Sequence, residues 1–231
     1  AAKLLASASG CLVTHPNVMN GGSLSEIDER IFYVEGYSLD RFAKGEIGLK
    51  KVNQQKIGII FDSSIEKEIL LRHLQVADAC IATLGINITS YVMTEQPLGI
   101  VINDQSLGIS GGYIKNPEAL INAGKSLLKK GITAIAIVAK FPDEIDSLSL
   151  QHYREGKGID SISGAEAVIS HTISKYLKVP CAHAPALTPI ELKEDLDPRA
   201  AAEEIGYTFL PSVLIGLNKA PNLVELPNHN A

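Results

Sequence analysis

The segments IGIIF at residues 57–61 and ITAIAIV at residues 132–138 are apolar almost throughout. A strand with one buried face alternates apolar and polar side chains, whereas a parallel strand covered by helices on both faces is apolar at nearly every position. Both segments are also short and end at polar or turn-forming residues, as buried strands do. They therefore predict a largely parallel sheet with helices on both sides.

Around these two segments, short apolar runs alternate with helical patterns along most of the chain. We expect further strands at residues 11–14, 31–35, 90–93, 98–103, 179–183 and 208–217. We expect helices at residues 65–84, 116–131, 164–177 and 198–204. This alternation is typical of a three-layer α/β fold, in which helices flank a Rossmann-like sheet.

Polar residues mark the starts of the three long helices. Ser63 and Glu66 have the spacing of a capping box, in which both side chains bond free backbone groups at the helix start. Ser163 and Glu166 repeat this spacing, and Asn116 precedes a proline that suits the first helical position. Because Glu166 is assigned to a cap, we do not consider it as a general base.

The composition is typical of a globular protein with one sizeable core. The chain has 231 residues, of which 45% are hydrophobic and 20% are charged. We expect a single α/β domain over residues 1–217 and a loosely packed tail over residues 218–231. No apolar run approaches the roughly 20 residues of a membrane span. A net charge of −5 with scattered basic residues also argues against nucleic-acid binding, so we expect a soluble protein with neither partner.

The cysteine pattern favours a reducing compartment. Cys11, Cys80 and Cys181 lie far apart, and none belongs to a CxxC motif, so we expect a cytoplasmic protein. The opening AAKLLASASGC has the small residues and positive charge of a lipoprotein signal, but serines dilute its apolar part. The sequence begins with Ala1 rather than Met, and we therefore expect that a segment precedes it.

Polar residues follow several of the expected strands, which is where ligands bind in open α/β sheets. Thr14, His15 and Asn17 follow the first strand, and Glu35 ends the second. Lys140 comes at the end of an apolar strand, where desolvation lowers the pKa of a lysine. Glu35 and Lys140 are therefore candidates for proton transfer. Thr14 and Asn17 are candidates for contact with a ligand.

Cys181 and His183 are two residues apart in an expected strand, so their side chains share one face. Together with His15, this pair allows three interpretations. A neighbouring imidazolium lowers the pKa of a thiol and makes it a nucleophile. One sulfur and two imidazole nitrogens can instead hold zinc. The third interpretation is structural, with Cys181 buried in the core and each histidine hydrogen-bonded in place.

A glycine-rich segment, GISGGY at residues 108–113, precedes the helix expected from residue 116. Backbone amides freed by glycine, close to a helix amino terminus, can bind an anion. Gly108, Ser110, Gly111 and Gly112 are therefore candidate ligand contacts. The segment matches neither GxGxxG nor the P-loop pattern, and a flexible turn is the alternative.

The segment REGKGID at residues 154–160 combines alternating charges with two glycines. Such a loop can close over a carboxylate or phosphate, with Arg154 or Lys157 holding the negative charge. The alternative is a solvated loop without a ligand, because loops are generally polar and exposed.

Six strings along the chain are informative together. They are THPNV (14–18), YVEGYSLDRFAKGEIGL (33–49), LRHLQVADA (71–79), GAEAVISH (164–171), VPCAHAPAL (179–187) and PRAAAEE (198–204). In these strings the chain resembles a family of proteins of unknown function that is common in photosynthetic bacteria and plastid-bearing organisms. The resemblance implies no known catalytic residue. It does imply an additional amino-terminal segment in family members, with a strand and a glycine-rich turn, that this chain lacks.

The sequence favours an enzyme that acts on a small anionic metabolite, with His15, Cys181 and His183 as its reactive group. Hydrolytic, lyase and isomerase chemistry all stay open, because this architecture hosts many activities. The rival hypothesis is a non-catalytic ligand-binding or regulatory homodimer that uses the same pocket. No nicotinamide, flavin or nucleotide fingerprint is present, so we expect no organic cofactor.

Overall fold

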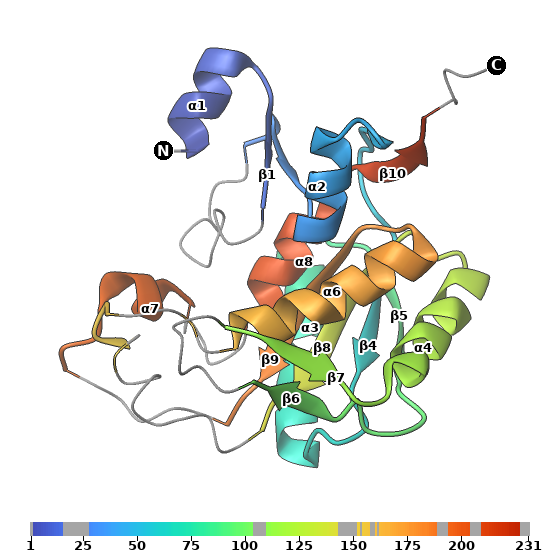
Figure 1. Ribbon diagram of the computed structural model, residues 1–231, viewed down its shortest axis with the longest axis vertical. Coiled ribbons are helices and arrows are strands. Elements are labelled where there is room, and N and C mark those ends of the chain that lie inside the picture. Colours follow the sequence, from blue (N-terminus) through green and yellow to red (C-terminus); the bar gives the residue numbers. More distant parts are fainter. Residues whose placement is uncertain are drawn as a thin grey trace.

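Figure 1 shows the computed structural model of the chain. It describes residues 2–15, 28–103, 110–142, 152, 154–157, 160, 162–188, 194–203 and 209–226. A parallel four-stranded sheet lies at the centre, and helices pack against both of its faces. This arrangement confirms the expected mixed α/β fold. None of the described helices is long and apolar enough to span a membrane.

The central sheet has the strand order β5-β4-β8-β9, and every neighbouring pair is parallel. Its inner strands are β4 (Ile57–Phe61) and β8 (Ala134–Lys140), the two apolar segments that predicted the sheet. Every residue of β4 is buried, and β8 is buried up to its last residue. The outer strands are β5 (Ile88–Met93) and β9 (Cys181–Ala186). Burial on both faces therefore explains the continuous apolar pattern of the inner strands.

Two pairs of helices cover the two faces of the sheet. On one face lie α3 (Lys67–Leu84) and α8 (Leu210–Asn218). On the other lie α4 (Pro117–Lys129) and α6 (Ser163–Leu177). Neighbouring residues of β4 and β8 belong alternately to the two resulting cores, because successive side chains of a strand point to opposite faces.

Among the described residues, three two-stranded sheets lie outside the central one. They pair β1 (Leu12–Thr14) with β2 (Ile31–Tyr33), β6 (Ile100–Ile102) with β7 (Gly112–Ile114), and β3 (Ile47–Lys50) with β10 (Asn222–Glu225). The first pair is parallel and the other two are antiparallel. The remaining helices are α1 (Ala2–Ser9), α2 (Gly36–Ala43) and α7 (Pro198–Glu203). Helix α2 packs on α6, which brings the β1–β2 pair next to the edge of the central sheet (Figure 1).

The strand expected at residues 208–217 is wrong. Residues Leu210–Asn218 form helix α8, which is buried against the sheet. A short apolar run does not distinguish a buried strand from a buried helix, and Pro211 in the first turn was the overlooked sign of a helix start. Helix α2 was not predicted, because its eight residues are too few to show a clear helical period.

The two predicted capping boxes are also wrong. The structure begins α3 after Glu66 and α6 after Ile162, and neither start has a side-chain cap. The Ser163 hydroxyl donates instead to the carbonyl of Asp160 at 2.9 Å. Glu166 is therefore not part of a cap, and its carboxylate is available for other contacts.

The tail expected to pack loosely, residues 218–231, contributes a strand. Its segment Asn222–Glu225 forms β10 and pairs with β3. The Gln55 side-chain amide donates to the carbonyl of Ala220 and to Oδ1 of Asn222, each at 2.7 Å. These bonds attach this part of the tail to the body of the protein. Residues 227–231 lie outside the described residues.

Candidate functional site

The carboxyl ends of the parallel strands β1 and β2 bring His15 and Glu35 into one region. The N–H of Val34 donates to the carbonyl of Thr14 at 3.0 Å, so the two strands stay paired up to these residues. A Cβ on Gly36 would lie 3.5 Å from Nε2 of His15, which shows how closely this imidazole approaches the start of α2. Thr14 is itself buried, so little of its side chain is accessible to a ligand, and its predicted contact with one stays a prediction.

The Glu35 carboxylate is buried and fixed at the amino terminus of α2. Its Oε1 accepts hydrogen bonds from the N–H and the hydroxyl of Ser38, at 2.7 and 2.6 Å. Its Oε2 accepts from the N–H of Tyr37 at 2.9 Å. A negative charge at this end of a helix is stabilised by the helix dipole. Glu35 is therefore held in one position, as the cap of α2.

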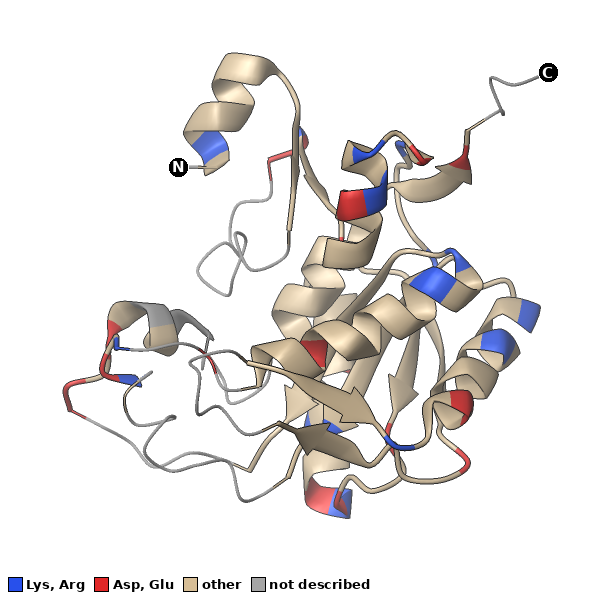
Figure 2. Ribbon diagram, in the orientation of Figure 1, with Lys and Arg blue, Asp and Glu red and all other residues tan. Residues whose placement is uncertain are grey.

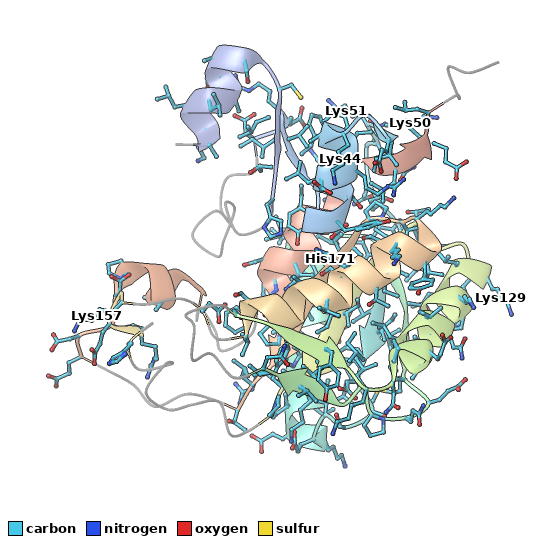
Figure 3. The ribbon with its side chains drawn as sticks, viewed as in Figure 1. Lys44, Lys50, Lys51, Lys129, Lys157 and His171 are labelled. Carbon is cyan, nitrogen blue, oxygen red and sulfur yellow. The ribbon has the colours of Figure 1, made fainter. Side chains whose placement is uncertain are left out.

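His171, on α6, lies opposite this carboxylate. Its Nε2 is 3.7 Å from Oε2 of Glu35, and its ring centroid is 6.0 Å from that of Tyr37. The Cβ absent from Gly36 would come within 3.2 Å of the same Nε2, so glycine leaves room for the imidazole. The His171 side chain is 41% exposed. Figure 3 shows it where α2 passes α6, at a position that solvent reaches.

His183, in strand β9, is held by two residues of α6. Its Nδ1 lies within hydrogen-bonding distance of the Ser170 hydroxyl, and its Nε2 lies 3.8 Å from the Glu166 carboxylate. The carboxylate favours a proton on Nε2, so Nδ1 accepts the hydrogen bond from Ser170. A Ser–His–acid triad has the same order of hydroxyl, imidazole and carboxylate, but there the serine meets Nε2 and the carboxylate meets Nδ1, so the ring nitrogens are exchanged here. Because Ser170 is only 2% exposed, we interpret it as a residue that positions His183 rather than as a nucleophile.

His15 interacts electrostatically with the other groups. Burial and the charge of His183 lower the pKa of His15, the charge of Glu35 raises it, and His171 lowers it again. The resulting pKa lies below the ordinary value of 6.5, so His15 is neutral at pH 7 and able to accept a proton. We use the name histidine cluster for these groups, which are His15, Glu35, Glu166, His171 and His183.

Cys181 lies on the same side of β9 as His183, but it is 1% exposed. Burial, and then the charge of Glu35, raise the pKa of its thiol well above the ordinary value. This direction is the opposite of the lowered pKa that a thiolate nucleophile needs. The cavity beside it, which Tyr33 also lines, has a volume of about 10 Å³, enough for one water at most. The geometry therefore favours the structural interpretation of Cys181.

The zinc interpretation of His15, Cys181 and His183 has no geometric support. Within the described ranges, no group of three or more histidine, cysteine, aspartate or glutamate side chains is arranged to hold a metal ion. The thiol of Cys181 is enclosed in the core.

Lys140 lies at the carboxyl edge of the central sheet and not in the histidine cluster. Its ammonium group pairs with Glu66, and its N–H donates to Oδ2 of Asp62 at 3.3 Å. Asp62 is completely buried, and its Oδ1 accepts from the N–H groups of Ser64 and Leu98 at 3.1 and 3.2 Å. The polar residues at this edge therefore bond to one another.

The described part of the glycine-rich segment packs closely on the start of α6. The Ser110 hydroxyl accepts a hydrogen bond from the N–H of Gly164 at 2.9 Å. A Cβ on Gly164 would lie 2.6 Å from the backbone of Gly111, and one on Gly112 would lie 2.6 Å from Cβ of Ala165. These glycines are required for close packing. Gly112 begins strand β7, so the described end of the segment is packed backbone rather than a flexible turn. Anion binding by this segment stays a prediction.

Lys157 and Arg154, two further predicted ligand contacts, are not brought to the histidine cluster. Figure 3 places Lys157 at the left edge of the molecule, away from His171 near its centre, and its ammonium pairs with the carboxylate of Glu155 at 3.4 Å. Arg154 belongs to the same segment and is buried there. Asn17 and Gly108 lie outside the described residues.

Three residues that surround the site were not predicted as site residues: Glu166, Ser170 and His171. The string GAEAVISH held the signal, because Glu166 and Ser170 are four residues apart and so share one face of a helix. His171 points to the neighbouring face, toward α2. Their partners are on β9 and α2, far away in sequence, so the helix alone did not reveal the contacts.

The comparisons with known proteins agree with the resemblance noted in the sequence. The model of a family described as proteins of unknown function, DUF3326, matches residues 1–231. An uncharacterized lipoprotein of Synechococcus sp. is 50% identical over 220 residues, which are 95% of this chain and 61% of that protein. The chain thus spans less than two thirds of this relative, and no solved structure matches it. The chain belongs to the DUF3326 family of proteins of unknown function.

Proposed function

We propose that this protein is an enzyme that transfers protons on a small anionic metabolite at the histidine cluster. The observation that supports this proposal is the convergence of three imidazoles and two carboxylates from separate elements of the fold. A partly buried histidine whose pKa is shifted by burial and by nearby charges, as that of His15 is, is typical of acid–base sites. Hydrolytic, lyase and isomerase reactions are all within the reach of such a cluster.

The environments of the histidines support different roles. His15, with its lowered pKa, acts as the proton acceptor. His171 is partly exposed beside the Glu35 carboxylate, so its ring contacts the metabolite from the open side. His183 is oriented by Glu166 and Ser170 and stabilises charge that develops on the substrate.

The experiment incubates the protein with a panel of small carboxylates and phosphate esters and follows their conversion by proton NMR. We expect turnover of at least one compound, and a loss of about 100-fold or more in His15→Asn, as removal of a general base typically causes. His152→Asn, which changes an exposed histidine outside the cluster, is the matched control. Turnover that survives in His15→Asn and His171→Asn would contradict the proposal.

A second candidate is a non-catalytic ligand-binding or regulatory homodimer that uses the same site. It is supported by the partners on both ring nitrogens of His183, which suit a fixed binding group as well as a catalytic one. The exposed Leu4 and Leu5 of α1 offer an apolar contact for a second copy. Thermal stabilisation by a panel compound without turnover, together with a dimer that Leu4→Glu dissociates in sedimentation experiments, would favour this candidate.

We also propose that the fold is three-layered and Rossmann-like. The support is the strand order, in which β4 comes first in sequence, β5 lies on one side of it, and β8 and β9 lie on the other. In doubly wound sheets the strand order reverses in the same way, and ligands often bind at the point of reversal.

For the location, we propose the cytoplasm. The three free cysteines support a reducing compartment. The Synechococcus relative is named a lipoprotein, so attachment to a membrane through a lipid is the competing possibility. Cell fractionation with an antibody against this protein distinguishes the two, because an anchored form would sediment with the membranes.

A further inference from the structure

A groove lies one helical turn away from the histidine cluster, between α2, the carboxyl end of α6 and the β3–β10 pair. We call it the α2–α6 groove. Its volume is about 320 Å³, at the lower end of the range for small-ligand pockets. Its charged lining residues are three basic and two acidic: Arg41, Lys175, Lys178, Glu46 and Glu225. Ile47, Leu223 and Leu226 are among its apolar lining residues.

The rim of the groove has an excess of positive charge. Arg41 pairs with Glu46 at 3.1 Å, and Lys178 pairs with Glu225. Lys175 has no ion-pair partner among the described residues, and its ammonium lies 5.7 Å from the centre of the Tyr176 ring. Figure 2 shows basic residues both on α2 and at the carboxyl end of α6. In a chain with a net charge of −5, this local excess can attract an anion.

The backbone at Lys178 gives independent support. This lysine ends α6 with φ of 55°, and it is the one residue other than glycine with a positive φ among those described. Glycine is preferred at such a position, because a side chain costs energy in the left-handed conformation. Strain of this kind is frequently associated with function. Lys178 also lines the groove, so its ammonium group can contact an anion that binds there.

We propose that the α2–α6 groove binds an organic anion with an apolar body, such as a carboxylate or sulfonate attached to aromatic rings or an acyl chain. The charged head contacts Lys175 and Lys178 and takes the place of Glu225. The apolar body lies on Ile47, Leu223 and Leu226. The proposal does not depend on the function of the histidine cluster, because none of these residues belongs to it.

The test is a fluorescence titration with 8-anilino-1-naphthalenesulfonate, an aromatic sulfonate. N-phenyl-1-naphthylamine, which has the same rings without the charge, is the matched probe. We expect the double variant Lys175→Gln/Lys178→Gly to bind the sulfonate about tenfold more weakly, since one exposed charge contact is worth up to about fivefold. It should bind the uncharged probe unchanged. Glycine suits the left-handed position, so the variant should unfold at the same or a higher temperature.

Two further variants sharpen the test. Glu225→Gln frees Lys178 from its carboxylate, so we expect tighter binding of the sulfonate. Lys129→Gln, on α4 and away from the groove (Figure 3), should have no effect. Equal binding of the two probes, or unchanged sulfonate binding in the folded double variant, would overturn the proposal. Because no residue of the histidine cluster is changed, this result would leave the proposed enzyme activity untouched.

Discussion

The carboxyl edge of the central sheet and that of the β1–β2 pair differ in what their polar residues do. At the central edge, the buried Asp62 accepts three backbone N–H groups, and Lys140 pairs with Glu66. At the other edge, His15 and Glu35 meet His171, whose ring is half-exposed. Both edges follow parallel strands, where a ligand is expected by the general rule. The comparison shows that polar residues at such an edge can be structural. The central edge pairs opposite charges and bonds its buried carboxylate to the backbone, whereas the β1–β2 edge brings imidazoles together.

Removing the buried carboxylate of the central edge should have the largest effect. Asp62→Ala leaves one buried and two partly buried N–H groups without an acceptor, and we expect it to lower the free energy of unfolding by about 3–5 kcal/mol. Urea denaturation measures the loss. Asp62→Asn keeps one acceptor oxygen and should lose less. A loss below about 1 kcal/mol in Asp62→Ala would show that this edge is not held by the carboxylate.

The corresponding carboxylate of the β1–β2 edge should matter less for stability. Glu35→Ala removes the cap of α2, and we expect a loss of about 1–2 kcal/mol. The measurement is the same urea titration, with Glu46→Ala on the exposed rim of the groove as control. If Glu35→Ala destabilised the protein as much as Asp62→Ala, the two edges would not differ in the way described.

The histidine cluster should also be visible in the pH dependence of stability. The folded protein holds the pKa of His15 below 6.5, so the unfolded chain binds a proton first as the pH falls. The free energy of unfolding therefore decreases below pH 6.5, and His15→Asn should make this decrease smaller. Burial also lowers the pKa of His73, so part of the decrease should persist. Urea titrations at pH 7.5 and 5.5 measure this decrease in the original protein and in His15→Asn. An identical decrease in the free energy of unfolding of both would contradict the prediction.

The smallest effect is expected for the exposed ion pair at the central edge. Lys140→Met breaks the ion pair with Glu66, whose side chain is about half exposed. The free energy of unfolding should therefore fall by no more than about 1 kcal/mol. Thermal unfolding at low and high salt measures it, and the difference from the original protein should shrink at high salt. A loss comparable to that of Asp62→Ala would mean that Lys140 has a buried role.

The pattern of apolar residues was sufficient to predict those helices and strands whose pattern is complete within one element. The apolar runs of β4 and β8 and the periodicity of α3, α4 and α6 gave these elements at nearly their observed positions. Helix α8 was mistaken for a strand because a short segment that is mostly apolar has no polar face to show its period. The capping boxes failed because spacing alone does not fix where the first turn begins.

The site was predictable only in part, because it joins distant segments. His15, Glu35 and His183 were recognisable as polar residues in or after strands. His171 and Glu166 face α2 and β9, and nothing within their own helix indicates those partners. Arg154 and Lys157 had suitable charges, but the fold carries their segment away from the cluster. The charges in a sequence indicate which groups could bind an anion, but not where in the fold those groups lie.

If His15, Glu35 and His171 form one coupled cluster, an NMR titration of the histidine ring nitrogens will show it. We expect His15 to titrate with a pKa below 6.5. The pKa of His15 should fall further in Glu35→Gln, which removes a negative charge, and rise in His171→Gln, which removes a positive one. His152→Asn should leave it unchanged. A His15 pKa at its ordinary value, equal in all these variants, would show that the histidines do not act together.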